Sequence, residues 1–220
     1  FAYTKCDFRV VAQYSDNQWG NLELIEDEVI AMHEGSSVIH YGQGCFEGLK
    51  GYKLSENKLS IFRPQKNAER FQMSCNRLLI PPISTDMFLE GLEKLITSNK
   101  HFVPNKQDGS LYIRPFVFGI GEHLGVAPSE KYHFRIFCCP ATSNYYNNMI
   151  SLGIMNDDRA AKYGIGHVKA IGNYASGLQV TRSVKEQGFD DVLYLDSVEK
   201  KYIEETNTSN CLFVKDNTLF

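Results

Sequence analysis

The chain has 220 residues, of which 43% are hydrophobic, so it is long enough to bury a substantial core as one large or two small domains. Its 23 basic and 26 acidic residues nearly balance and form no cationic cluster, which argues against nucleic acid or an anionic membrane as partner. No apolar run approaches the roughly 20 residues that a membrane-spanning helix needs. We therefore expect an intracellular protein, cytoplasmic by default, that binds small molecules. Because the sequence begins at Phe1 rather than Met, a trimmed segment that targets a mitochondrion or plastid stays an open alternative.

The six cysteines are scattered, with no C-x-x-C pair and no histidine at zinc-ligand spacing. This usage fits a reducing compartment and predicts no metal site. Cys138 and Cys139 lie in the apolar run at residues 134–139, where we expect buried free thiols.

The first part of the chain alternates predicted strands and helices. Short apolar segments punctuated by glycines at positions 42, 44, 48 and 51 suit strands joined by tight turns, and residues 59–62 predict a further strand. Pro64 begins a helix whose apolar residues recur at three and four, and Ser84 is the expected N-cap of a second helix. Aromatic and β-branched residues predict strands at 110–121 and 132–139. This part is therefore α+β.

A polar and aromatic segment at residues 144–148 is the expected loop between two domains. It separates a small N-terminal domain, residues 1–143, from a second α/β domain that starts at residue 149. The second domain shows a strand at 150–155, a glycine-rich turn, a helix from about Tyr174 to Glu186, and three further strands at 191–196, 200–205 and 210–216. These elements make a thin core, so we expect the molecule to continue beyond Phe220.

Lys169 is the first candidate for chemistry. A lysine is most often a solvated surface charge, but this one lies in a nearly uncharged stretch among Gly164, Gly166 and Gly172. Glycine is used where the backbone must turn sharply or let a ligand approach. An amine reacts with a carbonyl only when it is neutral, and loss of solvent favours the neutral form. The context favours a lysine that forms a Schiff base.

Glu205 is the second candidate, at the end of the strand predicted for residues 200–205. If Ile203 points to the core, Glu205 lies on the buried side and needs a partner. The alternative is a solvated strand end. Nearby in the sequence, Arg159 follows two aspartates and is expected to pair with them.

Two arginines and several aromatic residues complete the candidates. Arg70 lies beside Phe71 on a helix, and Arg114 follows Tyr112 by two residues, so that both side chains share one strand face. A planar, permanently charged guanidinium suits a phosphate or carboxylate, while a structural salt bridge is the alternative for either arginine alone. The aromatic candidates are core residues or the wall of an apolar pocket: Tyr41, Phe46, Tyr112, Tyr145 and Tyr174.

Five segments occur together in the order and spacing of one family: "HYGQGCFEGLKGY", "FRPQKNAER", "LYIRP", "KAIGNYASG" and "DVLYLD…YIEE…N". On these motifs the sequence resembles the branched-chain aminotransferases, pyridoxal-phosphate enzymes of fold type IV, and its later segments look most like eukaryotic, including plant, members. The resemblance implies a two-domain α+β fold, in which residues 149–220 begin a larger cofactor-binding domain that is incomplete here. Ile171 stands where many members have glycine.

The resemblance also assigns cofactor-binding residues. It makes Lys169 the catalytic residue, which binds pyridoxal 5'-phosphate as a Schiff base and moves the proton at the substrate α-carbon. Glu205 would pair with the pyridine nitrogen, and Tyr174 would hydrogen-bond the phenolic oxygen. Arg70 would hold the phosphate, and Thr208 would lie near the cofactor.

The substrate pocket follows from the same resemblance. Tyr112 and Arg114 would bind substrate carboxylates, Arg114 chiefly the distal carboxylate of glutamate. Phe46 and Tyr145 would line the apolar part of the pocket, together with Tyr41 from the second subunit of a homodimer. The pocket would bury the methyl groups of a branched side chain, while the arginine would serve glutamate.

The activity implied is that of a branched-chain-amino-acid transaminase. The amino group of L-leucine, L-isoleucine or L-valine would pass to 2-oxoglutarate, giving branched-chain 2-oxo acids and L-glutamate. Two alternatives stay open: a D-amino-acid aminotransferase or aminodeoxychorismate lyase of the same fold, and an inactive, truncated relative that serves as a binding or scaffold protein.

Overall fold

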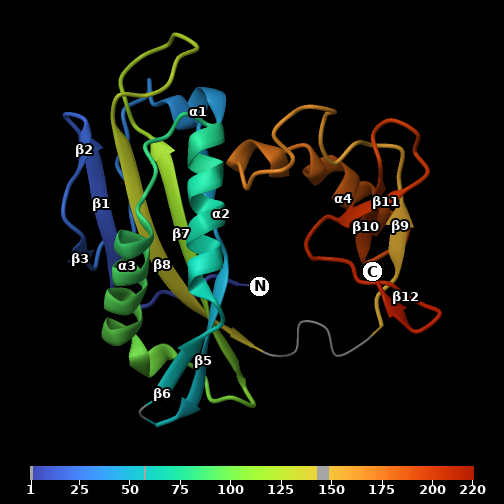
Figure 1. Ribbon diagram of the computed structural model, residues 1–220, viewed down its shortest axis with the longest axis horizontal. Helices are drawn as coiled ribbons and strands as arrows, with labels where there is room; N and C mark the ends of the chain where they lie inside the picture. The colour runs from blue at the N-terminus through green and yellow to red at the C-terminus, as the bar shows by residue number, and fades with distance from the viewer. Residues whose placement is uncertain (1, 57, 143–148) are drawn as a thin grey trace. The chain divides into compact units, whose positions relative to one another are not determined.

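The computed structural model describes residues 2–56, 58–142 and 149–220 (Figure 1). The chain divides into two compact units, one of Phe1–Tyr145 with Val168–Gly172 and the other of Tyr146–His167 with Asn173–Phe220. The expected loop at 144–148, and with it Tyr145, lies outside the described residues. Lys169 belongs to the first unit, although the residues on both sides of its segment belong to the second.

The first unit is built on an antiparallel sheet, which has eight strands among the described residues. Its main path runs β2-β1-β8-β7-β5-β6, while β3 pairs with β1 and β4 pairs with β7. The longest pairing joins β7 to β8 over eleven residues each. The strands are β1 (Arg9–Ser15), β2 (Gln18–Trp19), β3 (Glu23–Ile25), β4 (Gly44–Phe46), β5 (Leu49–Ser55), β6 (Lys58–Ile61), β7 (Gly109–Gly119) and β8 (Tyr132–Thr142).

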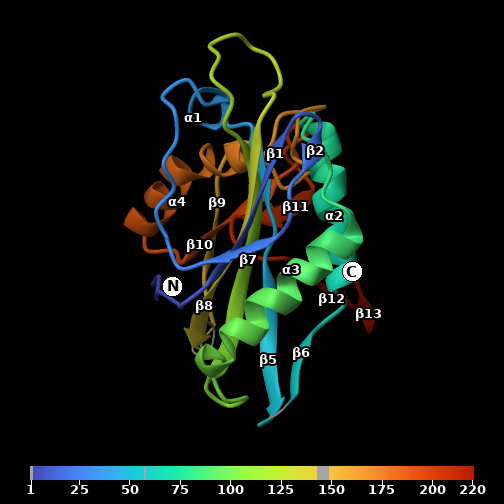
Figure 2. The same ribbon diagram turned by 90° about the vertical axis from the view of Figure 1, so that its left-hand side faces the viewer.

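Two helices cover one face of this sheet, α2 (Pro64–Arg77) and α3 (Thr85–Ser98), and α3 crosses the strands obliquely (Figure 2). Both begin where the sequence predicts. Pro64 is the first residue of α2, and the Ser84 hydroxyl caps α3 by accepting from the N–H of Met87 at 3.1 Å. Among the described residues of this unit, the other helical segments are a short helix α1 (Ser37–Tyr41) and a 3-10 turn (Lys100–Phe102).

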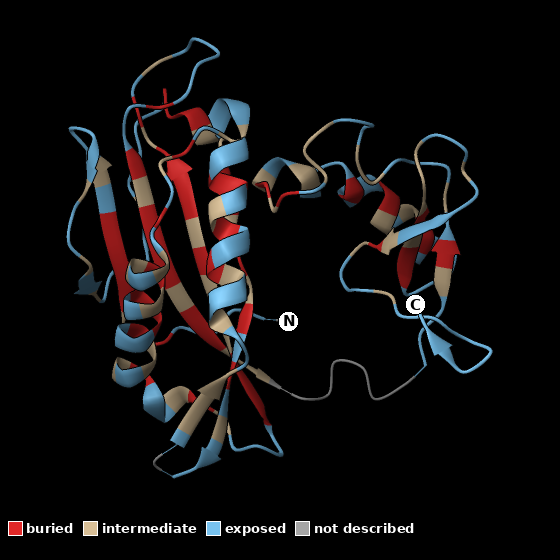
Figure 3. Ribbon diagram, viewed as in Figure 1, coloured by how far each residue is buried: buried red, intermediate tan, exposed pale blue. Residues whose placement is uncertain are grey.

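The two faces of the sheet have different side chains. Along β7, Leu111, Ile113 and Val117 are buried beneath the helices and form one core with apolar residues of α2 and α3 (Figure 3). Tyr112 and Arg114 alternate with them and are only half-buried on the opposite face, as the period of a strand requires. We call this opposite face, defined by Phe46 of β4 and by Tyr112, Arg114 and Phe116 of β7, the far face.

The second unit has a small sheet of its own. Strand β9 (Leu152–Ile154) runs parallel to β10 (Asp191–Leu195), and β11 (Ile203–Thr206) pairs antiparallel with β10. Helix α4 (Gly177–Glu186) packs on β10. The core consists of Val180, Val184, Val192 and Tyr194, a small apolar centre such as the sequence predicts. A hairpin of β12 (Val214–Lys215) and β13 (Thr218–Leu219) follows.

Several boundaries differ from the sequence prediction, most of them by one to three residues, and the larger differences lie in the second unit. A 3-10 turn (Ile171–Tyr174) precedes α4, which starts only at Gly177. Strand β12 is shorter than predicted, and β11 starts at Ile203 rather than 200. The late start of β11 has a local cause: the Asp196 carboxylate accepts hydrogen bonds from the N–H groups of Glu199 and Tyr202 among others, and so holds this stretch in a turn. The same hydrogen bonds lower the pKa of Asp196.

Candidate functional site

A short antiparallel contact with β4 positions Lys169. Cys45 forms an isolated bridge with Ala170, and the N–H of Phe46 donates to the carbonyl of Lys169 at 3.2 Å. Because Ala170 is fully buried with Cys45 on the core side, the half-buried Lys169 turns to the far face. Its Nζ lies 4.6 Å from the centroid of the Phe46 ring, within cation–π range. Lys169 is therefore held against an aromatic side chain instead of extending into solvent.

Ser74 of α2 fixes the backbone of Lys169. Its fully buried hydroxyl accepts from the N–H of Lys169 at 3.1 Å and donates to the carbonyl of Arg70 at 3.0 Å. The hydroxyl thus satisfies the lysine N–H and joins two candidate residues through one hydrogen-bonded chain. Sequence reasoning missed Ser74, although a serine among the apolar positions of α2 is a signal that could have found it.

The neighbouring Ile171 explains why β4 begins with glycine. A Cβ at Gly44 would lie 2.5 Å from Cδ1 of Ile171 and 2.9 Å from the carbonyl oxygen of Val117. Only a residue without a side chain lets the lysine segment lie this close to β4. The isoleucine noted as unusual in the sequence is therefore accommodated by Gly44.

Arg114 lies between two aromatic rings on the far face. Its Cζ is 4.3 Å from the centroid of Phe46 and 5.3 Å from that of Tyr112. Its Nη2 and Nε donate to the Tyr112 hydroxyl at 2.6 and 3.2 Å. Gly48 makes room for this hydroxyl, since a Cβ there would lie only 2.6 Å from it. The structure thus brings four predicted site residues together: Lys169, Phe46, Tyr112 and Arg114.

Arg70 forms a bidentate ion pair that the sequence analysis did not identify. Its Nε and Nη2 donate to the two oxygens of Glu47 at 2.6 and 2.7 Å. Glu47 is fully buried, whereas the Arg70 side chain is 49% exposed. Arg70 thus has a salt-bridge partner in Glu47, and its predicted place at the cofactor phosphate stays a prediction.

Tyr41 lies at the C-terminal end of α1, and its hydroxyl donates to the carbonyl of Leu124 in the loop between β7 and β8. Its side chain is 42% exposed. The role predicted for it in a second subunit stays a prediction.

In the second unit, Glu205 is paired with Arg159. The carboxylate lies 3.0 Å from Nε of Arg159, whose Nη2 also reaches Glu204 at 3.4 Å. The Nε–H is not aligned on the oxygen, so this contact is an ion pair and not a hydrogen bond. The expectation that Arg159 pairs with the aspartates beside it is wrong, because its ion pairs are with these glutamates.

The premise for burying Glu205 is also wrong. Ile203 is 48% exposed, and Glu205 is half-buried. The register of β11 on β10 shifts between Tyr194 and Leu195, and such an irregularity breaks the simple alternation of faces. The charged partner of Glu205 is therefore Arg159, and the carboxylate is not buried on the side of Ile203.

The two remaining predicted residues of this unit lie in turns. The hydroxyl of Thr208 donates to the buried carboxylate of Asp191 at 2.6 Å. Tyr174 ends the 3-10 turn and is 42% exposed. Their predicted places at the cofactor stay predictions.

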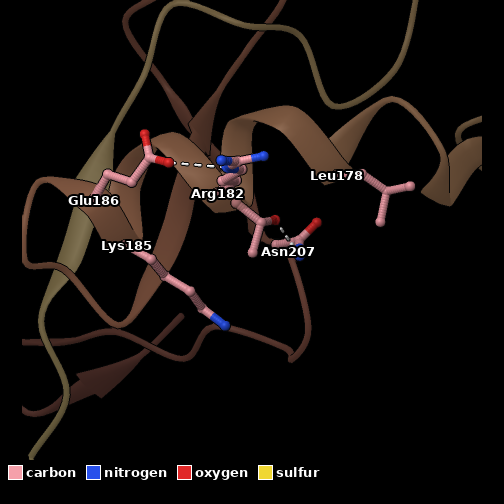
Figure 4. A pocket seen from close by; sticks show the side chains of 6 residues that line it. Leu178, Arg182, Lys185, Glu186 and Asn207 are labelled. Atoms are coloured by element: carbon pink, nitrogen blue, oxygen red, sulfur yellow. Dashed lines mark hydrogen bonds and ion pairs between the residues drawn. The ribbon is translucent and has the colours of Figure 1, made fainter.

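A shallow groove of about 500 Å³ lies along α4 (Figure 4) and contains none of the predicted site residues. Arg182 pairs with Glu186 at 2.9 Å within it, and the Asn207 amide donates to the Thr181 hydroxyl at 3.0 Å. In the described part of the chain, no helix is long and apolar enough to cross a membrane. Nor do the described residues include a group of three metal-ligating side chains placed to hold an ion.

A sequence model of the family described as amino-transferase class IV matches residues 44–220. The chain belongs to this family. The match begins at β4 and includes Lys169, Phe46 and Arg114. The predicted two-domain α+β fold is confirmed by this match and by the similar structures.

Relatives from bacteria and plants confirm the resemblance stated for the sequence. A branched-chain-amino-acid aminotransferase of Helicobacter pylori is 42% identical, over all of this chain and 66% of its own length. The chloroplastic branched-chain amino acid aminotransferase 2 of Humulus lupulus is 38% identical, over 92% of this chain and 48% of its own. The structure of the Escherichia coli branched-chain aminotransferase has a TM-score of 0.75 at 27% identity, covering 98% of this chain and 66% of that one. The chain thus spans two thirds or less of these relatives.

Proposed function

We propose that the protein is a branched-chain-amino-acid transaminase, which transfers the amino group of L-leucine, L-isoleucine or L-valine to 2-oxoglutarate. The observation that carries this proposal is the contact of an amine, Lys169, and a guanidinium, Arg114, with the one ring of Phe46. Transamination of an amino acid with an apolar side chain needs three groups: an amine for amino transfer, a guanidinium that binds the carboxylate, and an apolar wall for the side chain. The names of the relatives at 42% and 38% identity support it.

We infer that pyridoxal 5'-phosphate is the cofactor. Two structures of the same fold are described as a complex with pyridoxamine 5'-phosphate and as a PLP form. The donors of the first unit fit this group, because Lys169 offers an amine for its aldehyde and Arg70 a half-exposed guanidinium for its phosphate. When bound, the cofactor supplies that aldehyde and a ring that draws electrons from the substrate α-carbon. In the second unit, the roles of Glu205 and Tyr174 stay predictions.

The residues of the first unit then have distinct tasks. Lys169 moves the proton at the substrate α-carbon, and Ser74 keeps its backbone fixed while it does so. Arg114, oriented by the Tyr112 hydroxyl, binds a substrate carboxylate. Phe46 covers the apolar side chain and shields the amine from water.

The same proposal includes a homodimer and an intracellular location. Tyr41, exposed at the end of α1, would contribute to the pocket of the second subunit. Light scattering on the full-length protein measures the dimer. Loss of activity in Tyr41→Ala without loss of the dimer would support the role of this side chain in the pocket.

The decisive experiment maps the reactive amine. The full-length protein is mixed with pyridoxal 5'-phosphate, reduced with borohydride and digested. The peptide that carries the phosphopyridoxyl mass should contain Lys169. The variant Lys169→Ala should lose both the label and the turnover of L-leucine with 2-oxoglutarate, while Lys162→Ala, which changes an exposed lysine close in sequence, should keep both.

The alternatives predict other results. Turnover of D-alanine in place of L-leucine would indicate a D-amino-acid aminotransferase. A protein that neither takes the label nor turns over any amino acid would be the inactive relative. Ordinary turnover of L-leucine by Lys169→Ala would refute the assignment of the lysine.

A further inference from the structure

Glu47 is a charged residue with no exposure to solvent, directly after β4. Its carboxylate accepts from Nε and Nη2 of Arg70, from the side-chain amide of Asn67 at 2.8 Å and from the N–H of Gly48 at 3.3 Å. Burying a carboxylate is costly unless such donors surround it. Four hydrogen-bond donors therefore stabilise this one buried carboxylate beneath α2.

The pair is asymmetric, because only the acid is buried. The Arg70 side chain is 49% exposed, against 0% for Glu47. A half-exposed arginine on a helix would ordinarily move among many rotamers. Two charge-assisted hydrogen bonds to a buried, immobile carboxylate instead set the plane and direction of the guanidinium.

The backbone of Arg70 is fixed as well. Its carbonyl accepts from the Ser74 hydroxyl, which in turn accepts from the N–H of Lys169. Residues of α2 therefore fix the position of both the Arg70 guanidinium and the Lys169 backbone. A cofactor that bonds covalently to the amine and ionically to the guanidinium requires such a fixed relation between the two anchors.

We propose that Glu47 is a positioning residue, which orients the Arg70 guanidinium to bind the phosphate of the cofactor. This inference rests on the proposed function. By its charge alone, Glu47 should weaken phosphate binding, because it lowers the net positive charge at that site. The proposal predicts the reverse: removal of Glu47 should weaken phosphate binding because the arginine loses its orientation.

The test compares two probes that differ only in the phosphate, pyridoxal 5'-phosphate and pyridoxal. Their dissociation constants are measured by absorbance titration of the full-length protein. In Glu47→Gln we expect the constant for pyridoxal 5'-phosphate to rise about tenfold, as for the loss of one charge-assisted hydrogen bond. The constant for pyridoxal should stay unchanged. Glu69→Gln is the matched control, because it removes a carboxylate from an exposed ion pair on the same helix and should change neither constant.

Two further variants keep the test sharp. Glu47→Asp retains the charge but is too short to hold both nitrogens of Arg70, so it should also weaken binding of pyridoxal 5'-phosphate alone, even if Glu47→Gln does not fold. In the double variant of Arg70→Met with Glu47→Gln, the effect should not exceed that of Arg70→Met, because the glutamate acts through the arginine.

Each contrary result has a separate meaning. Tighter or unchanged binding of pyridoxal 5'-phosphate by Glu47→Gln would overturn the proposal, since the carboxylate would then act only by its charge or not at all. An equal loss for both probes would overturn it as well, because it would indicate a general structural defect. Failure of the unaltered protein to bind either probe would refute the proposed function itself.

Discussion

The charged ends of Lys169 and Arg114 lie against the same aromatic ring, at 4.6 and 4.3 Å from the centroid of Phe46. Two like charges repel, and their shared contact with one electron-rich ring offsets part of that repulsion. Phe46 reaches this place because β4 pairs with β7 on one side and with the lysine segment on the other.

Replacement of Phe46 by leucine should lower kcat/KM for L-leucine about tenfold, since the two cation–π contacts together contribute about 1–2 kcal/mol. Phe46→Tyr keeps the ring and should retain activity. The control is Phe62→Leu, which removes an exposed ring that also faces an arginine. Steady-state kinetics measure the effect, and equal rates for Phe46→Leu and the unaltered protein would mean that the ring only fills space.

Gly48→Ala should displace the Tyr112 hydroxyl, because the new Cβ would lie 2.6 Å from it. Arg114 would lose its 2.6 Å hydrogen bond, so we expect the KM for 2-oxoglutarate to rise about tenfold. Gly125→Ala is the matched control, since a Cβ at Gly125 has no neighbour within 4 Å. An unchanged KM in Gly48→Ala would separate Tyr112 from substrate binding.

Ser74→Ala should destabilise the protein by about 1–3 kcal/mol, because it leaves the N–H of Lys169 without the buried hydroxyl that accepts from it. Ser55→Ala, at the exposed end of β5, should stay within about 0.5 kcal/mol. Urea unfolding measures both. We also expect Ser74→Ala, kept folded at low temperature, to be labelled by pyridoxal 5'-phosphate and borohydride more slowly than the unaltered protein. An equal rate of labelling would mean that Ser74 matters only for stability.

His133 should make the protein less stable in acid. Burial, and next the charge of Arg135, lower the pKa of His133 from 6.5 to about 4 in the folded state. The unfolded chain therefore binds this proton first, so the histidine costs no stability above about pH 6.5 and destabilises the fold progressively from there down to about pH 4. His133→Phe should flatten that part of the urea-midpoint profile. A parallel profile in the variant would assign the acid sensitivity to other groups.

The elements of the first unit could be predicted where the signal is local. Pro64 and Ser84 mark helix starts by their own backbone and side-chain chemistry, and the alternation around Arg114 places Tyr112 on its face. The register shift in β11 has no such local mark, which is why the side of Glu205 could not be read from Ile203.

The site was harder to predict because its contacts are distant in sequence. Lys169 meets Phe46 across more than a hundred residues, and no periodicity reports which strand edge receives it. Glu47 and Ser74 were missed for the same reason: each is an ordinary polar residue until the fold places Arg70 or Lys169 next to it.

The segment at residues 168–172, which contains Lys169, makes the first unit discontinuous in the amino-acid sequence. Residues 168–172 complete one edge of β4, yet they are separated from the rest of that unit by residues 146–167 of the other. A shortened protein that ended at residue 143 would expose the peptide groups of β4 that face Lys169, and such an open edge invites association with other chains. The smallest fragment that holds the Lys169 amine on Phe46 must therefore include residues 168–172, and a domain boundary drawn between the two units cannot be a single cut.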